Sequence, residues 1–424
     1  MARLIPATLA LILLTCAAFA ASVHVRSADG TWVEIQASEQ DGTVGFTVTP
    51  EETDSGTALV VINKPDWMVL ADDAPPAVVS YQVAGRIFEV ESPDEPLVLS
   101  GLGEDADGRR VTFSITDDAN PIDVRAARLR IDGRPALQPE VVEDDREARS
   151  AKLTIDLNDF GPGAWQGALE VPDLSPMGNT LSIPLQFSIA GAQIAESAQS
   201  ATLSGGGAGF TVRGHNRQTV AVDAADVAAF LSLQPGTEKH LYVRRFAGIE
   251  DLGAEAGWHR VEATVELQDI DGKPVTDEEV GVSLRMRFAV HNDIPAIVVT
   301  STAVNLAETR PMYAFWGWLP GDGYVTSDGR AHEWSMNYGD VNPDGWVLLP
   351  AMDSRPGVGW ISDGDFGQSR FGTMLLYTDP QKPRVATGDA VVSTFALMPA
   401  TEIDEVAEVA ARLSEAGALQ PAGQ

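Results

Sequence analysis

Short runs in which apolar and polar residues alternate are the feature of this sequence that most constrains its fold. Alternation has the period of a β-strand, because successive side chains of a strand point to opposite faces of a sheet. The runs are rich in β-branched and aromatic residues, and clusters of Gly, Pro, Asp and Asn separate them as turns would. Predicted strands in the first third of the chain are 31–35, 43–49, 58–62, 78–83, 111–115 and 127–131. Regular short strands of this kind favour antiparallel sandwiches over alternating strands and helices.

Length and composition indicate several domains. The chain has 424 residues, of which 44% are hydrophobic, and this is enough for two or three domains that each bury a core. We expect an all-β fold of tandem antiparallel β-sandwiches, the second larger than the first, with one C-terminal helix. The expected segments are a signal peptide at 1–20, a small sandwich or strands completing the next domain at 21–92, a sandwich at 93–192, a Gly/Ser linker at 193–209, a large sandwich at 210–400, a helix at 401–417 and a tail at 418–424.

The first twenty residues have the character of a signal peptide. Arg3 gives a short positive start, residues 9–14 are apolar, and residues 18–20 form a small-x-small cleavage signal. The sequence therefore predicts export, to the periplasm or the extracellular space. Cys16 is the only cysteine and lies inside this segment, so we expect no disulfide in the mature chain. Lipoprotein anchoring at Cys16 is disfavoured, because the threonine before it is a poor residue at that position.

The net charge of the chain limits the classes of molecule that it is expected to bind. The chain carries 29 Lys and Arg against 61 Asp and Glu, a formal net charge of −32. Such a field repels phosphate backbones and anionic membrane surfaces, so we expect no nucleic-acid partner. The same field tolerates neutral glycans and attracts divalent cations. The alternative is that the net charge of −32 serves only to keep the protein soluble. After the signal peptide no apolar stretch approaches the roughly 20 residues of a membrane span, so none is expected.

The segment 93–191 resembles the bacterial immunoglobulin-like sandwich domains of large exported proteins. The resemblance rests on residues 117–122, 128–133, 163–165 and 171–179. In that family a strand ends in a D-x-S-P-x-x-N turn, which Asp173, Ser175, Pro176 and Asn179 match here. The physical interpretation agrees, because Asp and Asn bond backbone at strand ends and Pro stops a ladder. The resemblance implies a fold, with no chemistry attached to it.

The segment 210–400 predicts more and longer strands, which suggests a large two-sheet sandwich. The strands are expected at 241–245, 258–268, 280–290, 296–304, 312–318, 346–349, 373–377 and 391–398. Residues 298–305, 315–318, 388–389 and 395–397 resemble the super-sandwich of galactose-mutarotase-like domains. That resemblance implies a domain built around a sugar. The epimerases of that fold carry a His-Pro-aromatic signature where this chain has Trp316-Gly317-Trp318-Leu319-Pro320, so no catalytic residue is carried over.

An aromatic belt in the second half of this segment is the candidate ligand site. Sugar rings stack on indole and phenol faces, while their hydroxyls require polar partners, and the belt supplies both kinds of group. The candidate ligand-binding residues are Tyr313, Trp316, Trp318, Tyr324, Arg330, Trp334, Trp346 and Trp360. Since large aromatic side chains are usually buried, the alternative is that these rings fill a core. Exposure around one groove would indicate a ligand, and enclosure would indicate a scaffold.

Metal and catalytic residues have weaker signals. Asp340, Asn342 and Asp344 match the first half of a D-x-[DN]-x-[DN]-G calcium loop, although plain Asp-rich hairpins have the same pattern. No cofactor is expected apart from calcium at this loop. His332 and Glu333 are candidates for acid and base, with no spacing rule to enforce their geometry. The leading hypothesis is an exported glycan-binding protein; the alternatives are a polysaccharide lyase or hydrolase and a non-catalytic structural or adhesive envelope protein.

The C-terminus predicts one helix. The apolar residues Ile403, Val406, Val409, Ala410 and Leu413 form a single stripe at helical spacing, which ends before a glycine. Residues 401–404 resemble a capping box in which Asp replaces Glu. We therefore expect a short amphipathic helix that packs on the last sandwich.

Overall fold

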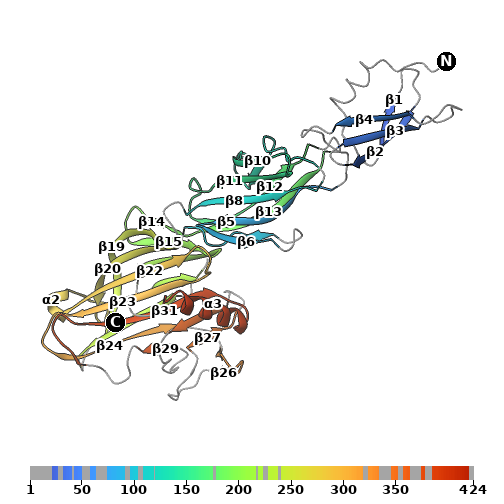
Figure 1. The fold of residues 1–424 in the computed structure, drawn as a ribbon. Helices are drawn as coiled ribbons and strands as arrows, with labels where there is room; N and C mark the ends of the chain where they lie inside the picture. Colours follow the sequence, from blue (N-terminus) through green and yellow to red (C-terminus); the bar gives the residue numbers. More distant parts are fainter. Residues whose placement is uncertain are drawn as a thin grey trace. The chain divides into compact units, whose positions relative to one another are not determined.

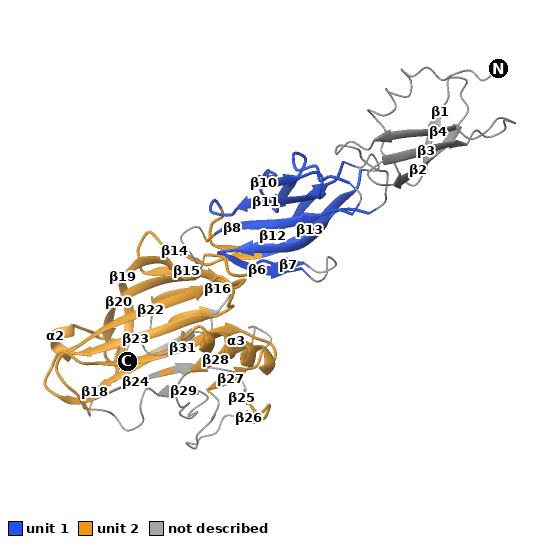
Figure 2. Ribbon diagram, viewed as in Figure 1, with its two compact units in different colours: residues 1–99, 109–159, 165–186 blue, residues 100–108, 160–164, 187–424 orange. Residues whose placement is uncertain are grey.

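In the computed structural model the chain forms two compact units (Figure 2). Unit 1 comprises 1–99, 109–159 and 165–186, and unit 2 comprises 100–108, 160–164 and 187–424. The structure describes residues 22–26, 32–40, 43–49, 58–63 and 74–419, except 91–95, 104–107, 119, 175–177, 216–217, 223–227, 237–239, 319–322, 334–344, 352–356, 363–373 and 378–383. For the first four strands, and for some residues of later strands, it describes the backbone alone. The predicted all-β class is confirmed, with a helix near the C-terminus.

Unit 1 contains a four-stranded sheet followed by a sandwich. The first sheet is an antiparallel meander of β1 (Ser22–Arg26), β2 (Trp32–Gln40), β3 (Thr43–Thr49) and β4 (Ala58–Asn63). One layer of the sandwich has the order β10 (Glu140–Asp145), β11 (Ser150–Asp156), β8 (Arg110–Thr116), β5 (Ala77–Val83) and β6 (Arg86–Glu89). The other has the order β7 (Leu97–Val98), β13 (Thr180–Ile189), β12 (Gly163–Pro172) and β9 (Arg128–Ile131). β5 and β6 belong to it, so residues 77–89 of the segment 21–92 supply strands to this sandwich.

Alternation along the strands builds the core of this sandwich. In β8 the buried residues are Val111, Phe113 and Ile115, every second position, as the period of a strand requires. The turn predicted after β12 is tied at its two ends, since Asn179 Nδ2 donates to Asp173 Oδ2 at 3.2 Å. Asp173 itself is buried, so this bond satisfies a carboxylate that has little access to water.

Unit 2 is a larger sandwich of two antiparallel layers (Figure 1). The first layer contains β14 (Gly191–Ile194), β15 (Ser200–Gly205), β16 (Ala208–His215), β17 (Gln218–Val222), β18 (Ala228–Pro235), β24 (Arg310–Trp318), β29 (Met374–Tyr377) and β30 (Arg384–Val385). The second contains β19 (Leu241–Glu255), β21 (Pro274–Val275), β20 (Trp258–Gln268), β22 (Val282–His291), β23 (Ile297–Asn305), β31 (Ala390–Pro399), β28 (Val358–Ser362), β27 (Trp346–Leu349), β25 (Gly323–Thr326) and β26 (Ala331–Glu333). Short pairings of β19 with β18 and with β16 join the layers.

One hydrophobic core lies between the two layers. It takes alternate residues from both, for example Leu231 and Leu233 of β18 and Phe288 of β22. This confirms the large sandwich predicted for the second half of the chain. The predicted strand 280–290 begins only at Val282, because the short helix α2 (Asp277–Val280) precedes it and ends at Gly281, whose φ is +63°.

The predicted Gly/Ser linker is wrong, because residues 193–209 contain the end of β14, all of β15 and the start of β16, three paired strands of the first layer. Residues Ser204 to Gly209 carry the end of β15, a turn at Gly206 and Gly207, and the start of β16. Both turn glycines have positive φ, +57° and +82°, which suits a tight hairpin. A Cβ on Gly205 would lie 2.6 Å from the carbonyl oxygen of His291. The glycines therefore allow close packing of the hairpin, and composition alone does not distinguish this from flexibility.

The C-terminal helix is confirmed as α3 (Ile403–Glu415), seen beside β31 and β27 in Figure 1. It buries the predicted stripe against the outer face of the second layer, where its apolar residues form a second cluster with residues such as Ile361 and Met398. The helix begins one residue later than a cap at Thr401 would give, since Glu405 accepts the backbone N–H groups of Thr401 and Glu402. Leu419, which the sequence placed in a tail, is buried in that cluster.

Among the described residues, no helix combines the length and the apolar character that crossing a lipid bilayer requires.

Candidate functional site

Two tryptophans of the predicted aromatic belt are core residues. Trp316 and Trp360 are both 0% exposed, and both rings contact Phe395, at centroid distances of 4.6 and 5.3 Å. Trp316 follows the core residues Met312 and Ala314 at every second position of β24, so the alternation of the strand directs its indole inward. A ring sealed from water cannot stack on a sugar. The ligand-binding prediction for these two residues is therefore wrong, and the core alternative holds for them.

Trp346 lies at a different place from these two rings. Its indole is partly buried and packs against the cluster under α3, on the other face of the second layer. The belt tryptophans of known position are therefore divided between two hydrophobic clusters, and they do not line one groove.

The hairpin of β25 and β26 holds three further predicted residues. Tyr324 is buried at the edge of the core, and burial raises the pKa of its phenol. The His332 ring stacks on Tyr324 at 5.0 Å, and Thr326 Oγ1 lies 3.1 Å from His332 Nε2. Arg330 is exposed and pairs with Asp328 at 3.2 Å. A hydrogen bond from the Thr326 hydroxyl is the main cause of the lowered pKa of Asp328. His332 is thus held in the hairpin by a stack and a hydroxyl contact.

The remaining predicted residues cannot be placed as side chains. Trp334, Asp340, Asn342 and Asp344 lie outside the described residues. For Tyr313, Trp318 and Glu333 the structure describes the backbone only. Across the described parts of the chain, no three His, Cys, Asp or Glu side chains converge as metal ligands would. The calcium loop and the His332–Glu333 pair therefore stay predictions.

A cluster of buried polar side chains lies on the outer face of the strands that join the two layers. Leu231 and Leu233 point into the core, so Ser232 and Gln234 between and after them point away from it. Tyr242 and Gln268 alternate in the same way with core residues of β19 and β20. Their exposed fractions are small, 0% for Ser232, 8% for Gln234, 7% for Gln268 and 9% for Tyr242. We call these four residues and the adjoining His240 the polar cluster.

Strand register brings the polar cluster together. Ser232 pairs with Tyr242 across β18 and β19, and Tyr242 pairs with Gln268 across β19 and β20. Ser232 Oγ lies 3.1 Å from His240 Nδ1, and the His240 and Tyr242 rings are 6.4 Å apart and nearly parallel. His240 is partly exposed, whereas the rest are buried. Hydroxyl, amide, phenol and imidazole groups thus meet on one surface.

The register also places a predicted ligand-binding residue beside this cluster. On β24 the Cα partner of Gln234 is Tyr313. The strand position of Tyr313, one of the residues proposed from the sequence, therefore adjoins the polar cluster.

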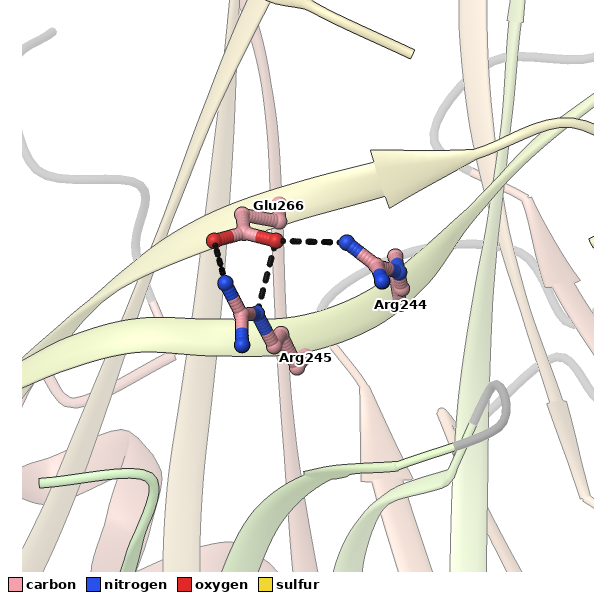
Figure 3. Close-up of polar contacts among 3 residues, drawn as sticks. All are labelled: Arg244, Arg245 and Glu266. Atoms are coloured by element: carbon pink, nitrogen blue, oxygen red, sulfur yellow. Dashed lines mark hydrogen bonds and ion pairs between the residues drawn. The ribbon is translucent and has the colours of Figure 1, made fainter. Parts of the chain in front are cut away.

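Two arginines share one carboxylate next to the polar cluster (Figure 3). Arg245 donates from Nε and Nη2 to the two oxygens of Glu266 at 2.7 and 2.6 Å, and Arg244 Nη1 donates to Oε2 at 3.0 Å. A bulge causes the arrangement, since the register of β19 on β20 shifts between Val243 and Arg245 and sets both arginines against Glu266. Hydrogen bonding to Arg245 is the main cause of the lowered pKa of Glu266, so this carboxylate is ionised at neutral pH.

A second set of charges lies further along the same face. Glu262 of β20 contacts Arg285 at 3.4 Å and Arg287 at 3.1 Å, both from β22. Glu262 and Glu266 alternate with core residues of β20, so both carboxylates lie on the outer face. Each of these two groups of side chains carries one more positive charge than negative, in a chain whose net charge is −32. Glu250, the Cα partner of Glu262 on β19, adds a negative charge beside the second group.

Sequence reasoning missed the polar cluster and the arginine pair, although one signal was present. The apolar residues Val243 and Phe246 are three positions apart, with Arg244 and Arg245 between them. A break of this kind in a period of two indicates a bulge. The polar residues of the cluster, in contrast, alternate as those of an ordinary solvent-exposed strand face do. Their burial could therefore not be predicted from the sequence.

Comparison with known proteins gave structural matches only. No protein-family model matches the sequence, and no curated protein sequence matches it. Among solved structures, a GH36 alpha-galactosidase, AgaB, from Geobacillus stearothermophilus aligns at 8% identity and TM-score 0.34 over 50% of this chain and 41% of that one. An alpha-mannosidase from Enterococcus faecalis V583 aligns at 8% and 0.32 over 69% and 40%. A putative aldose 1-epimerase from Klebsiella pneumoniae subsp. pneumoniae MGH 78578 aligns at 7% and 0.30 over 62% and 93%.

The match to each of the two glycosidases covers about two fifths of that enzyme's length.

Proposed function

We propose that this chain is an exported protein that binds a glycan at the polar cluster, on the outer face of β18, β19 and β20. The observation that carries the proposal is the meeting of the polar side chains of Ser232, Gln234, Tyr242 and Gln268 with partly exposed His240 on a face that points away from the core. Such a surface suits a ligand that offers many hydroxyls.

The chemistry of the cluster matches a sugar. A sugar hydroxyl both donates and accepts, and so do the amides of Gln234 and Gln268 and the hydroxyls of Ser232 and Tyr242. The rings of Tyr242 and His240 add flat faces on which the C–H groups of a sugar ring can pack. Partly exposed His240 gives the cluster its edge toward solvent. We include Tyr313 in the proposed site because its strand position is opposite Gln234.

The proposal places this site in a modular exported protein. The N-terminal segment 1–20 supports a signal peptide, and the turn at Asp173 and Asn179 supports an immunoglobulin-like unit as a spacer. Unit 2 is proposed as the sugar-binding super-sandwich of galactose-mutarotase type. Its two antiparallel layers and single core support that assignment.

Tyr242→Phe tests the proposal, because it removes one hydroxyl and little volume. Affinity for the glycans that the purified chain selects on a mixed array should fall about fivefold to tenfold, the usual value of one hydrogen bond. Tyr81→Phe is the matched control, since Tyr81 is a buried tyrosine of unit 1 that donates to the Val98 carbonyl oxygen at 3.2 Å. Titration calorimetry of both variants checks the difference.

Three other results would contradict the proposal. Equal losses in the two variants would move the site away from Tyr242. An array without any bound glycan would leave a structural envelope protein, the alternative that the buried Trp316 and Trp360 favour. Release of shortened products from a bound polysaccharide, abolished by His332→Ala in a folded protein, would show a lyase or hydrolase.

A further inference from the structure

The arginine pair and the polar cluster occupy one continuous surface. Glu266 precedes Gln268 by two positions on β20, and the bulge of β19 sets both Arg244 and Arg245 against Glu266. Side chains two positions apart on a strand lie on the same face, roughly 7 Å apart. The register therefore continues from the uncharged groups of the cluster directly into the charged group drawn in Figure 3.

The charges of this group do not cancel. Glu266 carries one negative charge and receives three hydrogen bonds, two of them from Arg245 in a bidentate pair. Arg244 uses its Nη1 on the same carboxylate, and its side chain is 39% exposed. One positive charge is thus left over, on a planar guanidinium whose remaining donors suit an oxyanion. The bulge is what creates the surplus, because an unbroken register would place one arginine opposite Glu266.

We infer that the glycan bound at the polar cluster carries an anionic group, a carboxylate or a sulfate, which Arg244 binds. This inference rests on the proposed glycan binding and adds the class of sugar. A chain of net charge −32 repels acidic polymers, so recognition of an acidic sugar requires a local positive group of this kind. Because Arg245 already neutralises Glu266, Arg244 is the member available to a ligand.

Three matched probes test the charge. They are an oligomer of galacturonic acid, the same oligomer with its carboxyl groups reduced to neutral galactose, and a sulfated galactose oligomer. We expect the wild-type chain to bind an anionic oligomer about fivefold more tightly than the neutral one, the upper range for a partly exposed ion pair. Tighter binding of the galacturonic acid oligomer would identify the anionic group as a carboxylate, and tighter binding of the sulfated oligomer would identify it as a sulfate. The preference should shrink as salt is raised, because exposed charges are screened.

Arg244→Gln should abolish this preference while leaving affinity for the neutral oligomer unchanged. The substitution keeps the bidentate Arg245–Glu266 pair, so no carboxylate loses all its partners. Arg287→Gln is the control, because Arg287 also shares a glutamate with a second arginine and is 45% exposed, but its partner Glu262 lies six positions from Gln268 on β20. It removes the same charge from the same face and should keep the preference.

The possible failures are distinguishable. Equal binding of neutral and anionic oligomers would overturn the inference and leave the proposed glycan binding standing. An anionic preference that Arg244→Gln does not change, or that Arg287→Gln reduces equally, would overturn the role of Arg244. Binding of none of the three oligomers would overturn both the inference and the proposed function.

Discussion

Two outward-facing surfaces of unit 2 are buried, and they differ in chemistry. On β28 and β31 the outer residues are apolar, among them Ile361, Ala396 and Met398, and α3 covers them with its own apolar stripe. On β18 and β20 the outer residues Ser232 and Gln268 are polar and equally buried. Helix α3 accounts for the burial of the first surface, because it packs against that surface and apolar area removed from water stabilises the fold. The second surface carries groups that donate and accept hydrogen bonds, and this chemistry is why we propose a ligand there.

Leu413→Ala should have the largest effect on this comparison. Leu413 is fully buried in the cluster between α3 and the sheet, and alanine preserves helix propensity, so the loss reports packing alone. The free energy of unfolding should fall by about 2 to 5 kcal/mol. Denaturation followed by tryptophan fluorescence measures it, and the exposed Ser414→Ala is the control, expected within about 0.5 kcal/mol.

Glycan affinity of the folded Leu413→Ala variant should equal that of the wild type. A variant that loses binding without unfolding would show that the apolar surface contributes to the site, and the contrast between the two surfaces would fail.

Ser232→Ala should have a smaller effect on stability and a larger one on binding. It removes the hydroxyl that lies 3.1 Å from His240 Nδ1, so the imidazole loses a partner that positions it. We expect a loss of about 1 kcal/mol in stability and a fall of about fivefold in glycan affinity. Ser301→Ala is matched in chemistry and burial but lies on the core side of β23, opposite Ser393. It should lower stability alone, and an equal loss of affinity in both variants would remove the polar cluster from the site.

Period-two alternation predicted most strands of this fold, because each face of a strand meets a uniform environment. The run 258–268 is β20, and the apolar stripe of 401–417 is α3. The hairpin at Gly206 was not predictable in the same way. Glycine is common both in flexible segments and where two backbones approach closely. A glycine-rich segment therefore does not show by its composition whether it is a flexible linker or a tightly packed hairpin.

The site was less predictable than the fold, because alternation says which residues share a face and not which face is inside. Trp316 and Trp360 were assigned to the ligand side and lie in the core. Ser232 and Gln234 have the pattern of a solvated face and are buried. Burial of an outer face depends on what packs over it, which is a long-range property that no local window contains. Bulges such as the one at Arg244 also change the facing of every residue after them.

Glu405→Gln should have the smallest effect, and its pH dependence is the informative part. Backbone hydrogen bonds from Thr401 and then Glu402 lower the pKa of this carboxyl at the start of α3. A lowered pKa in the folded state means that the stabilisation is present above the unfolded value, near 4.5, and is lost as pH falls through the folded value. The wild type should exceed the variant by about 0.5 kcal/mol near neutral pH, since the group is exposed and screened. The gap should close below pH 4.

Glu408→Gln, which removes the same charge from the same helix four positions before Arg412, controls for net charge. A gap for Glu405→Gln that persists unchanged at pH 3 would show that the carboxylate does not hold the start of α3. The apolar surface would then depend on packing alone, which would make its contrast with the polar cluster sharper.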